Sequence, residues 1–235
     1  LLALAVAGTM ALSGGANADT SIAIIADSGT STVTSTSIRT LASTGTGTDT
    51  IILTGTAGAI TSVAGGSNLV TTTDTGTNTT MQVLSSTDTL VLVGAISTEA
   101  GDTLTISSND ADQNIILTIG AVTGSGTLTI TGVNDTASTT DDISVIASDI
   151  GVTGAAGTLA GLNITTETTN ASLSISEDAF VTTTTLTGTG SAIATLTLNG
   201  ASATNASLTG NVSLSGGVAG KAVLSLGVSG ASSTT

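Results

Sequence analysis

"TLTISSNDADQNIILTIG", residues 103–120, holds two segments of alternating aliphatic and polar residues on either side of a short acidic tip. Successive side chains of a β-strand point to opposite faces of a sheet, so each segment would carry one aliphatic face and one polar face. Asn and Asp favour turns because their side chains hydrogen-bond to the nearby backbone. The stretch therefore predicts a strand, a turn and a second strand.

The same alternation recurs along the chain, with Ser or Thr placed between Leu, Ile or Val. It returns in "TLTITG" (127–132), "SLSIS" (172–176), "ATLTLNG" (194–200), "NVSLSG" (211–216) and "AVLSLG" (222–227). Gly, Asn and Asp gather between these segments, where turns require them. Thr, Val and Ile are β-branched and prefer strands. These patterns predict an all-β fold.

Short strands separated by turns can build a solenoid, a sandwich or a membrane barrel. A barrel needs aromatic girdles and a sandwich usually centres its core on aromatic residues, yet the chain has a single aromatic residue, Phe180. Thin coils can be filled by Val, Ile, Leu and Ala alone. We therefore favour an elongated β-solenoid, similar to a parallel β-helix, with about 20 residues per coil and outer ladders of Thr, Ser or Asn. An antiparallel β-sandwich array is the alternative.

The composition excludes several classes of function. The 235 residues include no Cys and no His. Two are basic and sixteen are acidic, which gives a net charge of −14. Nucleic-acid binding needs Lys or Arg to displace phosphate counterions, so no nucleic-acid partner is expected. Catalysis by Ser-His-Asp or Cys-His groups is impossible, and zinc, haem and iron–sulfur sites lose their usual ligands.

The N-terminal stretch "LLALAVAGTMALSGGANADT" resembles the apolar core and cleavage region of a secretory signal. We expect residues 1–18 to be a signal peptide, cleaved after the small-x-small triplet Ala16-Asn17-Ala18, and residues 19–235 to form the strand-repeat region. The sequence begins on Leu without a basic segment, which indicates a fragment of a longer protein. No later stretch is long and apolar enough for a transmembrane helix, so none is expected in the mature chain.

The acidic tip places Asp110, Asp112 and Asn114 at the first three ligand positions of a calcium loop. The pattern then departs, because Ile115 stands where such a loop has Gly and Ala121 stands where it has Glu. Ile115 also begins the next alternating segment. The interpretation that these residues simply form a turn is favoured, and a weak calcium site is the alternative.

Other acidic pairs could serve a polysaccharide hydrolase, as paired carboxylates do in glycosidases. They are Asp141 with Asp142, Glu177 with Asp178, and Glu99 with Asp102. Sugar-cleaving β-helices also carry His and basic residues near their aspartates, and this chain has no His. We therefore expect no enzyme, and an acidic-site polysaccharide-active β-helix is the weakest alternative.

The short leader, the strand repeats and the near absence of Cys, Pro and aromatic residues resemble bacterial cell-surface β-strand-repeat proteins. Autotransporter passengers, haemagglutinin-like adhesins and some S-layer proteins belong to this loose group. The resemblance is compositional and covers nearly the whole chain. It implies a secreted or cell-surface structural protein that presents an adhesive Thr/Ser-rich surface to copies of itself or to matrix components. A self-assembling extracellular fibre subunit is the alternative.

Overall fold

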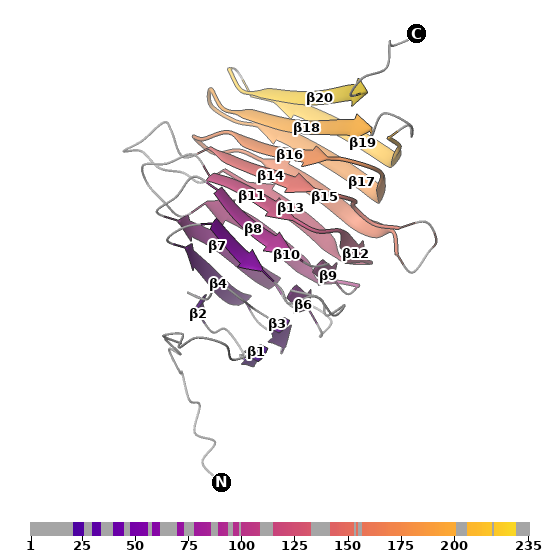
Figure 1. The fold of residues 1–235 in the computed structure, drawn as a ribbon. Helices are drawn as coiled ribbons and strands as arrows, with labels where there is room; N and C mark the ends of the chain where they lie inside the picture. The colour runs from indigo at the N-terminus through magenta and orange to yellow at the C-terminus, as the bar shows by residue number, and fades with distance from the viewer. Residues whose placement is uncertain are drawn as a thin grey trace.

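The computed structural model describes strands from Ser21 to Val228 and the side chains of residues 96–98, 100–107, 115–132, 142–152, 154, 157–199, 206–217 and 219–227. The expected signal peptide, residues 1–18, lies outside the described residues. Within the described part of the chain, the regular structure consists of strands. They fall into three sheets, and the strands of each sheet lie one above another (Figure 1).

The five-stranded sheet has, in spatial order, β1 (Ser21–Ile25), β3 (Thr40–Thr44), β6 (Val70–Thr72), β9 (Ile96–Thr98) and β12 (Val122–Gly124). The eight-stranded sheet has β19 (Leu208–Gly216), β17 (Ala179–Gly188), β15 (Leu159–Thr165), β13 (Thr127–Thr131), β10 (Thr103–Ser108), β7 (Asn78–Ser85), β4 (Thr48–Gly55) and β2 (Thr30–Val33). The seven-stranded sheet has β20 (Lys221–Val228), β18 (Ile193–Gly200), β16 (Ala171–Ile175), β14 (Ile143–Ala147), β11 (Ile115–Ile119), β8 (Thr89–Val93) and β5 (Gly58–Thr61).

Every pairing between the described strands is parallel. The all-β prediction is confirmed, and parallel strands in stacked sheets are compatible with a β-helix. The antiparallel sandwich array is wrong for these strands. Its strands would be joined by tight hairpins, whereas parallel neighbours need a longer connection that returns to the same end of the sheet.

From β4 to β12 the chain visits the three sheets in a fixed order. β7, β8 and β9 lie in the eight-, seven- and five-stranded sheets respectively, and β10, β11 and β12 repeat that order one strand further along each sheet. Beyond β12, isolated parallel bridges join Val122 to Ile150 and Ile150 to Ala179, so the line of the five-stranded sheet continues. Each circuit of the chain therefore adds one layer to the stack.

The circuits are longer and less regular than the predicted coils of about 20 residues. Thr131 and its register partner Thr165, on adjacent strands of the eight-stranded sheet, are 34 residues apart. Asn170, directly before β16, and Ile193, the first residue of β18, occupy equivalent places in the register and are only 23 residues apart. The turns between strands contain the extra residues of the longer circuits. A longer loop adds little to the entropic cost of loop closure, so turns of different length can connect strands that keep the same register.

The core is formed by the inward-facing aliphatic residues of the alternating segments. Leu104, Leu128 and Leu162 occupy one register row, and Ile106, Ile130 and Ile164 occupy the next inward row; all six are fully buried. The seven-stranded sheet contributes a facing row that includes Val145, Leu173 and Leu196, also fully buried. Burying such side chains stabilises the fold by roughly 1.5–3 kcal/mol each relative to exposure.

Among the described inward side chains of β10, β13, β15 and β17, one is polar. Thr184 continues the row of Leu104, Leu128 and Leu162, is fully buried, and its Oγ1 has no hydrogen-bond partner. The register of β17 against β19 shifts between Phe180 and Thr183. This irregularity leaves Thr182 and Thr183 both exposed, and it turns Thr184 and Leu186 inward. A β-bulge of this kind switches the faces that follow it.

Candidate functional site

The outward positions of the eight-stranded sheet form a regular polar surface, which we call the hydroxyl face. It consists of three register rows from β10 to β19: Thr103, Thr127, Gly161, Thr183 and Asn211; Thr105, Thr129, Asn163, Thr185 and Ser213; and Ser107, Thr131, Thr165, Thr187 and Ser215. All of these residues are uncharged, and all are at least partly exposed except Ser107 and Gly161, which are buried. The alternation of each strand builds this face automatically, because its partner positions point into the core.

The side chains of the hydroxyl face are linked along the rows. Thr165 Oγ1 donates a hydrogen bond to Thr131 Oγ1 over 3.2 Å, and Asn163 Nδ2 donates to Thr129 Oγ1 over 3.5 Å. A hydroxyl can donate once and accept twice, so a row that is linked internally still presents hydrogen-bonding capacity outward. Neighbouring strands are about 4.8 Å apart, which sets the repeat of this array along the stack.

The outward side of the seven-stranded sheet is less uniform. One of its rows runs Ile116, Ser144, Ser172 and Thr195, and the next runs Thr118, Ile146, Ser174 and Thr197. Asn199 Nδ2 donates to Ser174 Oγ over 2.8 Å. Because Ile116 and Ile146 interrupt the hydroxyls, the eight-stranded sheet carries the more regular polar surface.

Asp and Asn side chains at the turns link successive circuits by hydrogen bonds. Asp142 precedes β14, and its Oδ1 and Oδ2 accept hydrogen bonds from the main-chain N and the Nδ2 of Asn170, both over 2.8 Å. Asn170 precedes β16, and its Oδ1 accepts from the main-chain N of Ile193 over 2.7 Å. Each side chain thus binds the backbone of the next circuit at the same place in the turn.

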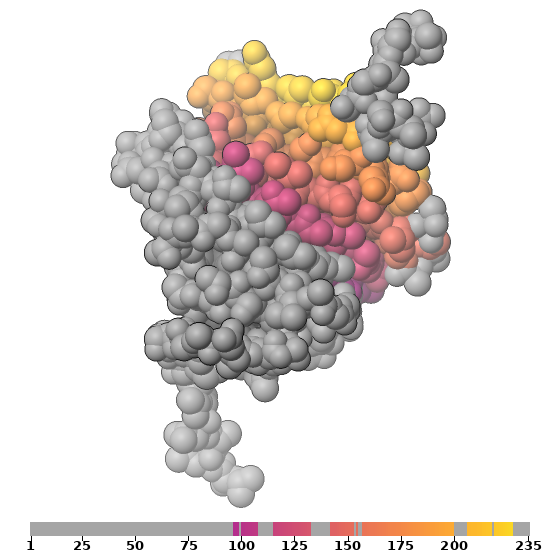
Figure 2. Space-filling model, in the orientation of Figure 1, coloured from indigo at the N-terminus to yellow at the C-terminus, as the bar shows by residue number. Residues whose placement is uncertain are grey.

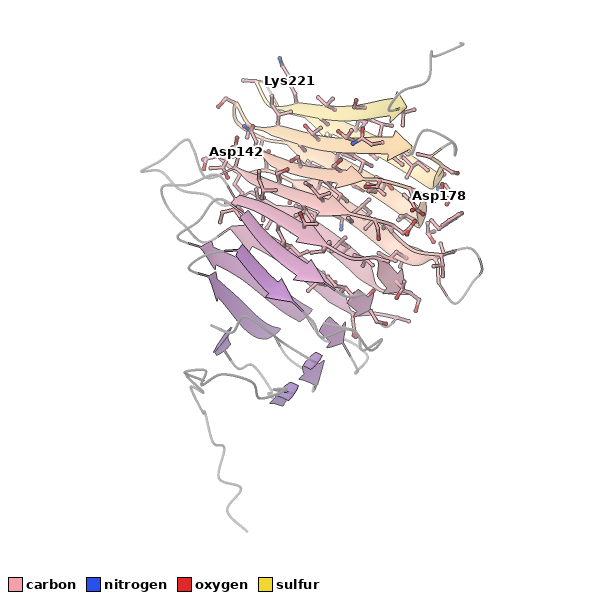
Figure 3. All side chains as sticks on the ribbon, viewed as in Figure 1. Asp142, Asp178 and Lys221 are labelled. Atoms are coloured by element: carbon pink, nitrogen blue, oxygen red, sulfur yellow. The ribbon has the colours of Figure 1, made fainter. Side chains whose placement is uncertain are left out.

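A second ladder runs along a different turn. The main-chain N of Asp178 donates to Asp149 Oδ1 over 3.4 Å, and the main-chain N of Ser207 donates to Asp178 Oδ1 over 2.8 Å. Figure 3 places Asp142 and Asp178 at opposite edges of the stack. Asp142 and Asp178, which were considered for hydrolysis, therefore bind main-chain N–H groups in two separate turns. Glu99 and Asp141 lie outside the described residues.

The predicted calcium ligands Asp110, Asp112 and Asn114 also lie outside the described residues, so the weak calcium site stays a prediction. Ile115 begins β11, as the alternation predicts. Among the residues with described positions, no group of three or more His, Cys, Asp and Glu side chains could hold a metal ion.

The two turn ladders are not predicted from the sequence. Their signal is a recurrence of Asp or Asn directly before or near a strand: Asp142 and Asn170 are 28 residues apart, and Asp149 and Asp178 are 29 apart. A search for Asx residues at the period of the circuits could have found them. The irregular circuit lengths elsewhere concealed this period.

Comparison with known proteins gives no family: no family model, no curated protein and no solved structure matches the chain significantly. No helix long and apolar enough to cross a bilayer occurs among the residues that the structure describes. The fold and the hydroxyl face define the class to which the chain is assigned, an all-β protein of parallel strands in stacked sheets.

Proposed function

We propose that this protein is an exported structural protein whose chain winds as an elongated β-solenoid and displays the hydroxyl face at the cell surface as a contact surface. The observation that carries the proposal is the continuity of the three polar rows across β10, β13, β15, β17 and β19, above aliphatic rows that are fully buried in β10, β13 and β15. The fixed order in which the chain visits the three sheets from β4 to β12 supports the solenoid.

The chemistry of the hydroxyl face suits a neutral, polyhydroxylated partner such as a polysaccharide. Its rows offer donors and acceptors without formal charge, which match the hydroxyl groups of a neutral sugar polymer. The net charge of −14 would repel anionic partners. A single hydroxyl contact contributes little, but contacts repeated along a polymer reinforce one another through effective concentration. The proposed role is therefore adhesive and structural, and it assigns no catalytic step to the chain.

The stacking of circuits is tested with engineered cysteines, since the chain contains none. The Thr129→Cys/Asn163→Cys variant places thiols on register partners of adjacent strands. Adjacent strands lie about 4.8 Å apart, within the Cα range of a disulfide, so oxidation is expected to cross-link this pair. Thr129→Cys/Thr185→Cys is the control, because β15 lies between its strands. Equal cross-linking of both pairs would contradict the stacking.

The contact surface is tested by sedimentation of the purified chain with an insoluble neutral polysaccharide such as cellulose. The triple variant Thr105→Val/Thr129→Val/Thr185→Val removes hydroxyls from the middle row of the hydroxyl face and keeps side-chain shape. Binding is expected to weaken by about tenfold or more, because each hydrogen bond contributes about 0.5–1.5 kcal/mol.

The matched control is Thr118→Val/Thr195→Val/Thr197→Val, which makes the same change on the seven-stranded sheet. It is expected to bind as the unmodified chain does, and circular dichroism checks that both triples keep their sheet content. Equal losses for the two triples, or no binding by the unmodified chain, would contradict the adhesive role of the hydroxyl face.

A further inference from the structure

The middle row of the hydroxyl face continues into the earlier strands of the eight-stranded sheet. Thr105 of β10 pairs with Thr80 of β7. Thr80 in turn pairs with Thr50 of β4, and Thr50 pairs with Thr30 of β2. The row therefore has Thr, Asn or Ser at its register position in all eight strands of this sheet. Adjacent strands lie about 4.8 Å apart, so the row is on the order of 30 Å long.

The two rows beside the middle row are interrupted. The first row contains Gly161, which has no side chain, and the third row contains Ser107, which is buried. At the register position of β4, the third row has Ile52. In the middle row, by contrast, every residue from β10 to β19 is at least partly exposed. The middle row is therefore the row of the hydroxyl face that has a polar residue in every strand.

The side chains of the middle row retain hydrogen-bonding capacity. Among the described residues, the hydroxyls of Thr105 and Thr185 have no hydrogen-bond partner. Thr129 Oγ1 accepts one hydrogen bond, from Asn163 Nδ2. A hydroxyl can donate one hydrogen bond and accept two, so Thr129 can still donate. Each of these hydroxyls can therefore bind a hydroxyl group of a ligand.

The middle row runs along the stack and crosses the strands. Figure 2 shows the direction of the stack, along which the coloured atoms pass from magenta through orange to yellow. A ligand that follows the row must be extended and must offer a hydroxyl at each step of about 4.8 Å. A β-1,4-linked chain of glucose units meets this condition, because its equatorial linkages keep it straight and each unit spans about one strand spacing. Along one edge of such a chain, secondary hydroxyls alternate with hydroxymethyl groups, and the row can donate to or accept from both.

We propose that the middle row binds a single extended β-1,4-linked glucan, which lies along the stack with one sugar unit on each strand. This inference rests on the proposed adhesive function and narrows the partner to one class of polymer. An α-1,4-linked chain of the same glucose units curves into a helix, so its hydroxyls leave the row after a few units. Contacts along the row reinforce one another through effective concentration, so affinity increases with the number of units bound.

The length and linkage of the ligand are tested by isothermal titration calorimetry of the purified chain with soluble oligosaccharides. Cellohexaose is expected to bind at least about tenfold more tightly than cellotriose, because twice as many units contact the row. Maltohexaose has as many glucose units as cellohexaose but α-1,4 linkages, and it is expected to bind at least about tenfold more weakly. Equal affinities for cellohexaose and maltohexaose would overturn this inference and leave the proposed function standing.

The direction of the glucan is tested with two variants that each remove three hydroxyls from the hydroxyl face. The row variant, Thr105→Val/Thr129→Val/Thr185→Val, changes one residue on each of three strands. The strand variant, Thr127→Val/Thr129→Val/Thr131→Val, changes three residues of β13 alone. A glucan along the stack loses more contacts in the row variant. The affinity for cellohexaose is therefore expected to fall by at least about tenfold in the row variant and by about threefold in the strand variant.

Circular dichroism checks that both variants keep the sheet content of the unmodified chain. An equal or larger loss of affinity in the strand variant would overturn this inference, because the glucan would then lie along a strand. Binding of insoluble cellulose without binding of cellohexaose would also overturn it and leave the proposed function standing. If the unmodified chain bound neither the oligosaccharides nor cellulose, both this inference and the proposed function would be wrong.

Discussion

Replacing Leu128 with alanine is expected to lower the free energy of unfolding by about 2–5 kcal/mol. Leu128 is fully buried in the middle of the row that also contains Leu104 and Leu162. The strands on both sides are held by parallel ladders, so the circuits cannot close around the missing atoms, and a cavity remains. Urea denaturation followed by circular dichroism measures the effect.

The control for this prediction is Thr127→Ala, one residue earlier on the same strand. Thr127 points outward and pairs with Gly161, so its loss opens no cavity in the core. A cost below about 1 kcal/mol is expected there. Similar losses at residues 127 and 128 would contradict the division of β13 into a buried face and an outward face.

The Gly124→Ala substitution is expected to lower the free energy of unfolding by about 3 kcal/mol or more, which is near the upper end of the effects of single substitutions. Gly124 has φ of 104°, a conformation that side chains rarely adopt. A Cβ at this position would lie 1.9 Å from the main-chain oxygen of Thr98 on the preceding circuit. The substitution therefore adds backbone strain and also forces β12 away from β9.

Gly154→Ala separates these two contributions. Gly154 has a similar φ of 111°, but no atom lies within 4 Å of the Cβ that it would gain. Its free energy of unfolding is expected to fall by about 1–3 kcal/mol, from backbone strain alone. The difference between the urea midpoints of the two variants then reports the cost of the steric contact between β12 and β9. If Gly124→Ala were no worse than Gly154→Ala, the tight packing of β12 on β9 would be wrong.

The alternating segments were predictable because alternation is a local property. "TLTIS" (103–107) falls in β10, "TLTITG" (127–132) covers β13, and "NVSLSG" (211–216) and "AVLSLG" (222–227) fall in β19 and β20. The polar side chains between the aliphatic ones became the hydroxyl face. What could not be predicted was the circuit length, because it depends on turns whose composition does not specify how many residues they contain.

The turn ladders of the candidate site also could not be predicted from local sequence patterns. Asp142 and Asp178 belong to the acidic pairs that, taken from the sequence, could serve a polysaccharide hydrolase. Their partners, Asn170 and Ser207, are 28 and 29 residues away. Only the stacking of circuits brings each pair within hydrogen-bonding distance, where Asp142 Oδ1 and Asp178 Oδ1 accept from main-chain N–H groups and Asp142 Oδ2 accepts from Asn170 Nδ2.

Residue order alone determined that this chain forms strands, that they have one aliphatic and one hydroxyl face, and that His- and Cys-based chemistry is absent. These conclusions rest on the two-residue period of an extended backbone and on side-chain identity. Tertiary structure alone decided that the strands are parallel and which of the four threonines 182–185 enters the core. The register shift after Phe180 turns Thr184 inward. That choice depends on pairing with strands far away in the sequence, which no local pattern encodes.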